Sequence, residues 1–466
     1  MQKILPADIL SPILAYMRIQ GDHKVILESI PRDSETARFS ILAYNPVFEV
    51  RYENGQLTKN GQVIKADPLD YLHELAVKKN HHSDLPFGGG AIGFVGYDMI
   101  SLYEEIGQIP ADVIGTPDMH FFVYESYMVF DHKKDKVYIV EEALYSDRSE
   151  ADLAASLERI MAELAQPAAD EFSPLELSSL NFQSHIEQTA FEKMVEEARS
   201  LIRQGDMFQC VLSQRFSAEY SGRPLDYYRN LRVTNPSNYL YFYDFGDYQI
   251  IGASPESLVS VKQGQVTTNP IAGTRPRGKD EREDKALAEE LLADEKEVAE
   301  HRMLVDLGRN DIGKIAQNNS VEVTKYMEVE YFRYVMHLTS VVRGQLLPQL
   351  TAMDALKSTL PAGTVSGAPK IRAMKRIYEL EQEKRGVYAG AIGYLSATGD
   401  MDFAIAIRTM ILKNGRAYVQ AGAGIVYDSI PANEYQETIN KAKSMTKIGE
   451  MQWFYWLIIM ILLLTI

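Results

Sequence analysis

Two pairs of glutamates offer oxygen ligands for a metal ion. Glu297 and Glu300 lie three residues apart in a segment with helical periodicity, and Glu434 and Glu437 repeat this spacing near the C-terminus. Residues three apart share one face of a helix, so each pair presents two carboxylates together. Mg²⁺ commonly takes one or two protein carboxylates and completes its shell with water and substrate oxygens. From spacing alone an ordinary solvated helix face is the favoured interpretation, since such pairs are common on exposed helices.

Glycine clusters and isolated cations could bind an anion. The clusters occupy residues 271–274, 361–367 and 420–424, where bare backbone lets amides approach a ligand closely. Arg408 could clamp a carboxylate with two hydrogen bonds, and Lys441 shares the helix face of the second glutamate pair. The alternative is a set of turns with one internally satisfied arginine.

Two other reactive side chains are ambiguous. His337 lies among apolar residues, which fits either a core histidine or an acid–base group. Cys210 is the only cysteine, lies in an apolar run and is predicted to be structural. A single cysteine permits no intramolecular disulfide, which fits a cytoplasmic protein. Residues 88–93 satisfy G-x-G-x-x-G but lead into no helix, so a dinucleotide site is not expected.

The overall composition is that of a globular protein with an acidic surface. The chain has 466 residues, of which 46% are hydrophobic, and a net charge of −16. No global positive field exists to attract nucleic acid, and an anionic substrate would need local cations or a metal ion. The apolar run 453–466 is shorter than the roughly 20 residues of a membrane-spanning helix. It is expected to be a packed or added terminal segment rather than a membrane anchor.

The predicted elements divide the chain into four parts. Residues 1–165 are β-rich, 166–186 form a Pro- and Ser-containing linker, 187–449 form a mixed region and 450–466 are the apolar tail. Strands are predicted within 121–130 and 137–140, and long helices over 281–307 and 432–448. Because no regular βαβ alternation appears, we predict an α+β fold rather than a doubly wound sheet.

An ordered set of short motifs extends over most of the chain. They are residues 252–256, 270–278, 306–311, 335–337, 363–370, 420–424 and 440–442. Together these motifs resemble those of the chorismate-utilising enzymes, among them the large, aminating subunits of anthranilate synthase. The resemblance implies that family's fold, with mixed, largely antiparallel sheets packed against helices.

The resemblance also implies a role for each candidate residue. Glu300 and Glu434 are expected to bind Mg²⁺ directly, with Glu297 and Glu437 bonding through water. The expected catalytic residues are Glu256, His337 and Thr364, with Glu256 and His337 as alternative general acids. The expected substrate-binding residues are Gly273, Thr274, Tyr388, Arg408, Gly422, Gly424 and Lys441.

The implied reaction is amination of chorismate by ammonia, followed by elimination of pyruvate to give anthranilate, the first committed step of tryptophan biosynthesis. Ala272 stands where aminodeoxychorismate synthases have a lysine that attacks the ring. Gln209 stands where isochorismate and salicylate synthases have a lysine that activates water. The alternatives are an aminase that stops at aminodeoxyisochorismate and a catalytically silent, tryptophan-binding protein.

The resemblance implies two further partners. Ammonia would come from a separate glutamine amidotransferase subunit, in a heterotetramer. Tryptophan would inhibit by binding at Ser29 and at a second segment that contains Pro236, Asn238, Tyr239 and Leu240. Asn238 replaces a proline and Leu240 a methionine of the family pattern, so we expect inhibition with altered affinity.

Overall fold

The computed structural model describes residues 1–30, 38–168, 180–331 and 335–447. The tail predicted at 450–466 lies outside the described residues, and the predicted linker is described only at its two ends. None of the described helices is both long enough and apolar enough to cross a membrane.

The first sheet contains twelve strands, and every pairing between neighbours is antiparallel. Its order along the sheet is β1 (Gln2–Pro6), β10 (Lys136–Glu141), β9 (Ser126–Asp131), β3 (Phe39–Ala43), β2 (Val25–Glu28), β13 (Tyr239–Asp244), β14 (Tyr248–Ser254), β23 (Thr409–Lys413), β24 (Arg416–Ile425), β12 (Gln209–Glu219) and β11 (Gln183–Ser184), with β20 (Gly367–Ala368) pairing with β12.

The second sheet also contains twelve strands and is likewise antiparallel. Its order is β17 (Ile271–Pro276), β19 (Val335–Gln345), β16 (Gln265–Thr268), β15 (Ser257–Lys262), β22 (Met401–Ile405), β21 (Ala391–Ser396), β7 (Gly90–Val95), β8 (Met119–Tyr124), β4 (Phe48–Glu53), β5 (Gln56–Lys59) and β6 (Gln62–Ile64), with β18 (Glu322–Tyr331) pairing with β19.

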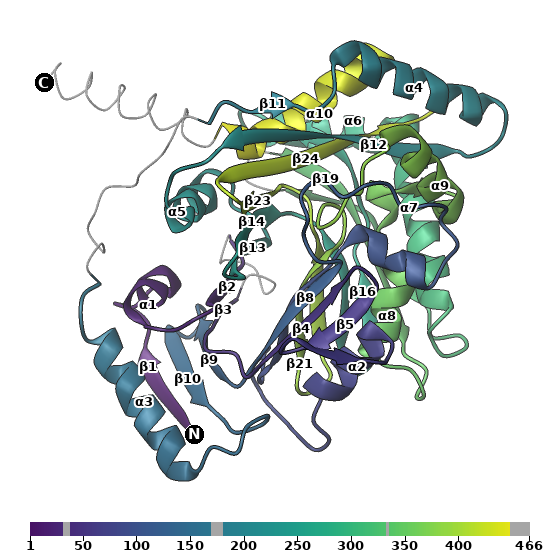
Figure 1. Ribbon diagram of the computed structural model, residues 1–466. Helices are drawn as coiled ribbons and strands as arrows, with labels where there is room; N and C mark the ends of the chain where they lie inside the picture. The colour runs from purple at the N-terminus through teal and green to yellow at the C-terminus, as the bar shows by residue number, and fades with distance from the viewer. Residues whose placement is uncertain (31–37, 169–179, 332–334, 448–466) are drawn as a thin grey trace, which may run out of the picture.

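Helices cover the outer faces of the two sheets (Figure 1). The first sheet packs against α1 (Pro12–Arg18), α3 (Glu150–Leu164), α5 (Pro224–Thr234) and α10 (Pro431–Thr446). The second packs against α2 (Pro68–Ala76), α7 (Glu295–Gly313) and α8 (Ala352–Thr359), whereas α9 (Lys370–Glu381) packs against β12 of the first sheet. Apolar and aromatic residues from both sheets meet in a shared core between them. The α+β fold with antiparallel sheets is therefore confirmed.

Strands from both halves of the chain alternate within each sheet. The N-terminal strand β2 pairs with β13, and β7 pairs with β21. The regions 1–165 and 187–449 are thus divisions of the sequence that fold into shared sheets. This interleaving brings residues from distant parts of the sequence to one site.

Two predicted elements are wrong in their extent. The helix predicted over 281–307 is two helices, α6 (Glu281–Ala293) and α7, because the Asp294 carboxylate accepts hydrogen bonds from the amides of Lys296 and Glu297 and starts a new helix. The apolar run 121–130 is not one strand. It bends at buried Glu125, so that β8 and β9 enter different sheets.

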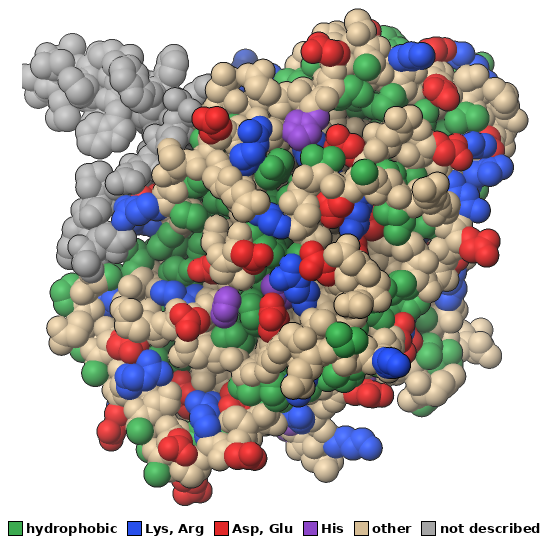
Figure 2. Space-filling model, viewed as in Figure 1, with side chains coloured by type: hydrophobic (Ala, Val, Ile, Leu, Met, Phe, Trp, Pro, Cys, Tyr) green, Lys and Arg blue, Asp and Glu red, His purple; other side chains and the backbone are tan. Residues whose placement is uncertain are grey.

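Acidic and basic side chains are interspersed on the face shown in Figure 2 rather than gathered by sign. Ion pairs among the described residues include Arg38 with Asp131 at 2.6 Å and Lys384 with Asp118 at 2.7 Å. The net negative charge is therefore spread as mixed charge over this face.

A substitution at Gly93 on β7 tests whether β7 and β8 of the second sheet pack as closely as the structure shows. A methyl group there would lie 2.0 Å from the His120 carbonyl oxygen on β8, so the strands would have to separate. We expect Gly93→Ala to lower the free energy of unfolding by about 2 kcal/mol or more, measured by urea denaturation. Gly313→Ala is the matched control, because nothing lies within 4 Å of the added methyl. Equal stabilities of the two variants would contradict this packing.

Candidate active site

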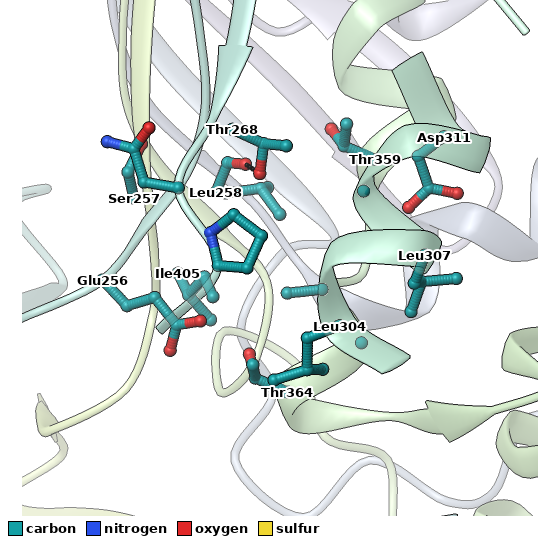
Figure 3. Close-up of a pocket in the computed structure, with 15 residues that line it drawn as sticks. Glu256, Ser257, Leu258, Thr268, Leu304, Leu307, Asp311, Thr359, Thr364 and Ile405 are labelled. Atoms are coloured by element: carbon teal, nitrogen blue, oxygen red, sulfur yellow. Dashed lines mark hydrogen bonds between the residues drawn. The ribbon is translucent and has the colours of Figure 1, made fainter. Parts of the chain in front are cut away.

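Glu256 lies in the short connection between β14 and β15 and lines a small pocket together with Thr364 and residues of α7. In Figure 3 its carboxyl group lies at the same end of the pocket as Thr364, and α7 contributes Leu304 and Leu307 to the opposite wall. Burial raises the pKa of Glu256 to about 7, although the Thr364 hydroxyl and two nearby cations oppose the shift. Glu256 can therefore hold a proton near neutral pH.

His337 on β19 is held against β17. Its Nδ1 lies 3.0 Å from the Gly273 carbonyl oxygen and 3.1 Å from the Thr274 hydroxyl. A carbonyl can only accept, so Nδ1 carries the proton and Nε2 is left as an acceptor in the neutral ring. Burial lowers the pKa of His337, and the charge of Arg408 lowers it further. This histidine is therefore a weak proton donor at neutral pH.

Arg408 is an exposed cation between these two groups. It connects β22 and β23 in a left-handed backbone conformation, with φ at 48°. Its charge acts on both Glu256 and His337. An anion bound by Arg408 would consequently lie close to both candidate acids.

The glycine-rich strand β24 forms another wall of the site. The Lys441 ammonium donates a hydrogen bond to the Gly422 carbonyl oxygen at 3.0 Å and pairs with Glu437 at 2.7 Å. The Tyr388 hydroxyl lies 2.9 Å from the place where a Cβ on Gly422 would stand. Only glycine allows this approach, so Tyr388, Lys441 and the β24 backbone form one surface.

The first glutamate pair lies on α7 beside β12 and β17. Glu300 accepts a hydrogen bond from Gln209 Nε2 at 3.1 Å, while Gln209 Oε1 is buried with no hydrogen-bond partner among the described residues. Burial raises the pKa of Glu297, and the carboxylates of Glu300 and Asp294 raise it further. This local excess of negative charge favours a cation.

The second pair lies on α10. Burial raises the pKa of Glu434, the Glu437 carboxylate adds to this effect, and the ammonium of Lys296 on α7 opposes it. The two helices thus approach one another at their glutamates. Within the described ranges, however, no three acidic, histidine or cysteine side chains gather closely enough to hold a metal by themselves. The donor set fits a hard cation that takes one or two carboxylates and fills its shell with water and substrate oxygens.

The segments predicted to bind tryptophan lie together, on the first sheet. Ser29 follows β2, which pairs with β13, and the Ile30 amide donates to the Ser237 carbonyl at 2.9 Å. This pairing places Ser29 beside the segment that contains Pro236, Asn238, Tyr239 and Leu240. The hydroxyls of Ser29 and Ser237 are buried without hydrogen-bond partners among the described residues.

Sequence reasoning missed several residues that support these sites. Glu28 pairs with Arg232 at 2.8 Å and accepts a hydrogen bond from the Tyr228 hydroxyl at 2.8 Å, directly beside Ser29. Arg385 and Glu381 form a fully buried ion pair behind β12. Glu28 lies in an apolar run, which was an available signal, but Tyr228 and Arg232 lie 200 and 204 residues away in the sequence. Glu381 and Arg385 are only four residues apart, but their segment is rich in charged residues, so nothing in the sequence marked this pair as buried.

Comparison with known proteins identifies the family. The family model described as chorismate binding enzyme matches residues 24–447. The chain belongs to the chorismate-binding enzyme family. It is 54% identical to anthranilate synthase component 1 of Lactococcus lactis subsp. lactis over 452 residues, which covers 96% of this chain and 99% of the relative.

Solved structures of this family share the fold. The crystal structure of anthranilate synthase component I from Streptococcus pneumoniae TIGR4 is 76% identical, with a TM-score of 0.86, and the match covers 95% of this chain and 99% of that one. The menaquinone-specific isochorismate synthase of Escherichia coli is 20% identical with a TM-score of 0.74, covers 96% and 94% of the two chains, and indicates the shared fold alone.

Replacing Glu256 should remove a pH dependence of stability. Its pKa rises from 4.5 to about 7 on folding, so the folded state binds this proton more tightly than the unfolded state. As the pH rises from 4.5 through 7, the free energy of unfolding of the wild type should therefore fall by up to about 3 kcal/mol relative to that of Glu256→Gln. Urea unfolding at pH 5 and pH 8 measures the difference. The control is Glu197→Gln, which changes an exposed side chain. If the stability of Glu256→Gln depended on pH in the same way as that of the wild type, the raised pKa of Glu256 would be contradicted.

Proposed function

We propose that this chain is the aminating component of a Mg²⁺-dependent anthranilate synthase, which uses ammonia to convert chorismate to anthranilate and pyruvate. The similarity to anthranilate synthase component 1 over almost the whole chain supports the conversion of chorismate to anthranilate in tryptophan biosynthesis. The site supports the chemistry, since an exposed arginine lies near a carboxyl group whose pKa is close to neutral. A cytoplasmic location, as the single cysteine suggests, is part of the same proposal.

The substrate has two carboxylates, and each has a proposed binding group. Arg408, Tyr388 and the amides near Gly422 and Gly424 bind the enolpyruvyl carboxylate. Their support is the common surface that Tyr388 and Lys441 form along β24. Gly273 and Thr274 complete the pocket opposite this surface.

The ring carboxylate is assigned to the metal. Glu300 and Glu434 would hold Mg²⁺ directly, and Glu297 and Glu437 would bond to it through water. The bound ion would supply positive charge to the ring carboxylate, which the net charge of −16 would otherwise repel. The raised pKa values of Glu297 and Glu434 support this assignment, because a cation would relieve the repulsion within each pair.

The leaving hydroxyl needs a proton, and Glu256 is the better placed of the two candidate acids. Its raised pKa lets it donate near neutral pH, and the Thr364 hydroxyl lies beside its carboxyl group. His337 is neutral and uses its Nδ1 proton to bind Gly273. We therefore assign His337 to positioning β17 and accepting a hydrogen bond at Nε2.

Two positions favour ammonia as the nucleophile. Ala272 offers no amine to attack the ring, so the covalent route of aminodeoxychorismate synthases is closed. Gln209 cannot act as a base toward water. Its Nε2 instead donates to Glu300, which leaves its buried Oε1 as an acceptor.

Product analysis tests this function directly. Purified protein, chorismate, Mg²⁺ and ammonium should give anthranilate and pyruvate, detected by fluorescence and mass spectrometry, and EDTA should stop the reaction. Glutamine should replace ammonium only when a glutamine amidotransferase subunit, proposed to assemble as a heterotetramer, is added. Accumulation of an aminated ring that retains its enolpyruvyl group would identify the sister aminase instead.

Removing one carboxylate charge tests the metal assignment. Glu300→Gln and Glu434→Gln should each lower the rate at saturating chorismate by about tenfold or more and weaken Mg²⁺ binding measured by calorimetry. The exposed Glu289→Gln on α6 is the matched control and should behave as wild type. Unchanged Mg²⁺ affinity in both site variants would remove the assignment.

The tryptophan site is proposed on the paired strands β2 and β13. Ser29→Ala removes a buried hydroxyl that has no partner among the described residues, so it should weaken inhibition by about fivefold to tenfold, the effect of one hydrogen bond. The uninhibited rate should not change, because Ser29 lies on a different part of the sheet from β24. Initial rates over a tryptophan titration measure this, and a flat wild-type titration would exclude the site.

A further inference from the structure

The ion pair of Arg385 and Glu381 is almost completely removed from water. The two side chains are 0% and 5% exposed. Arg385 Nε donates to Glu381 Oε2 at 2.9 Å and Nη2 donates to Oε1 at 2.5 Å, which is the two-pronged geometry of a strong arginine–carboxylate pair. Burial opposes the charge of Arg385, but the neighbouring carboxylate raises its pKa well above its usual range. Arg385 therefore stays charged inside the protein.

The guanidinium also binds the backbone of two active-site segments. Nη1 donates to the Val365 carbonyl at 2.7 Å, one residue after Thr364. Nη2 donates to the Val211 carbonyl at 2.7 Å, two residues after Gln209. Arg385 thus links the loop beside Glu256 to the start of β12.

Two further contacts extend this link to the substrate-binding surface. The guanidinium lies over the Tyr388 ring, 5.6 Å from its centroid. Glu381 Oε1 accepts from the amide and hydroxyl of Ser213 at 2.7 and 2.9 Å, and Gln420 Nε2 on β24 donates to the same hydroxyl at 2.9 Å. The pair therefore contacts β12 and the Tyr388 ring directly, and it reaches β24 through the Ser213 hydroxyl.

Stability alone does not explain such a pair. Desolvating two charges costs nearly as much as their attraction returns, and apolar side chains of similar volume often replace buried pairs without loss. Hydrogen bonds from a rigid, planar donor instead restrict where each bound backbone segment can lie. The pair is thus suited to holding several segments in one arrangement.

We propose that the Arg385–Glu381 pair positions Gln209 and Thr364 for the amination reaction. Neither residue touches the reacting atoms, so both are positioning residues, and the inference rests on the anthranilate synthase function proposed above. Loss of the pair displaces groups that act on the reacting ring more than it alters the Arg408 site. It should therefore lower kcat more than it raises KM for chorismate.

The test replaces both charges together. The double variant Arg385→Met with Glu381→Leu leaves no uncompensated buried charge, so it should still fold, with a Tm lowered by the loss of the hydrogen bonds to Val211, Val365 and Ser213. We expect its kcat to fall about 100-fold, the effect of displacing catalytic groups by about 1 Å, with KM for chorismate changed less than about threefold. Wild-type kcat in this folded variant would overturn the proposal.

A second variant covers the case in which the double variant does not fold. Arg385→Lys keeps the charge opposite Glu381 but cannot bind that carboxylate and both carbonyls in the same planar geometry. Its kcat should fall about tenfold. Unchanged kcat and KM would overturn the proposal equally.

Arg148→Met is the matched control. Arg148 pairs with Glu125 and Glu141, whose side chains are 1% and 0% exposed, beside β9 and β10 at the opposite end of the first sheet from β12. This variant should lose stability and keep wild-type kcat and KM. Anthranilate production by the wild type under the same conditions tests the proposed function separately, so a failure of one inference is distinguished from a failure of the other.

Discussion

An acidic protein can bind a dianion only where local positive charge outweighs its own field. The chain carries a net charge of −16, because it has 64 acidic and only 48 basic side chains. In the proposed site this charge comes from the exposed Arg408, from Lys441 held against β24, and from a metal ion held by carboxylates. The same glutamates that add to the negative charge would thereby become the means of binding a negative substrate.

This arrangement depends on the interleaved sheets. Glu256 follows β14 in the first sheet and precedes β15 in the second, so the chain crosses between the sheets at a candidate catalytic residue. Gln209 begins β12 and bonds to Glu300 on α7, whereas Arg408 precedes β23 and its charge acts on Glu256. Groups far apart in the sequence therefore converge on one region. Helices α7 and α10 then close the site from outside with their glutamates.

The sequence predicts elements that have a local periodic pattern, and it predicts properties that a resemblance to a known family implies. The α+β class, the helix that carries Glu434 and the family followed from periodicity and ordered motifs. The break between α6 and α7 at Asp294 could not be predicted in this way, because the helical pattern of the sequence continues through Asp294, whose side chain caps the next helix. The bend at Glu125 was not predicted, because the residues on both sides of it form one continuous apolar run. The reasons for a charged residue there, its ion pair with Arg148 and the crossing of the chain from one sheet to the other, are visible only in the structure.

The least predictable property is the acidity of individual groups. Glu256 and His337 look equally suitable in the sequence, and the family resemblance leaves both open. Their surroundings separate them, because burial raises the pKa of a carboxyl group and lowers that of an imidazole. One desolvated environment thus makes the glutamate a proton donor near neutral pH and keeps the histidine neutral. The assignment of acid chemistry therefore follows from the packing of β14, β17 and β19, rather than from residue type.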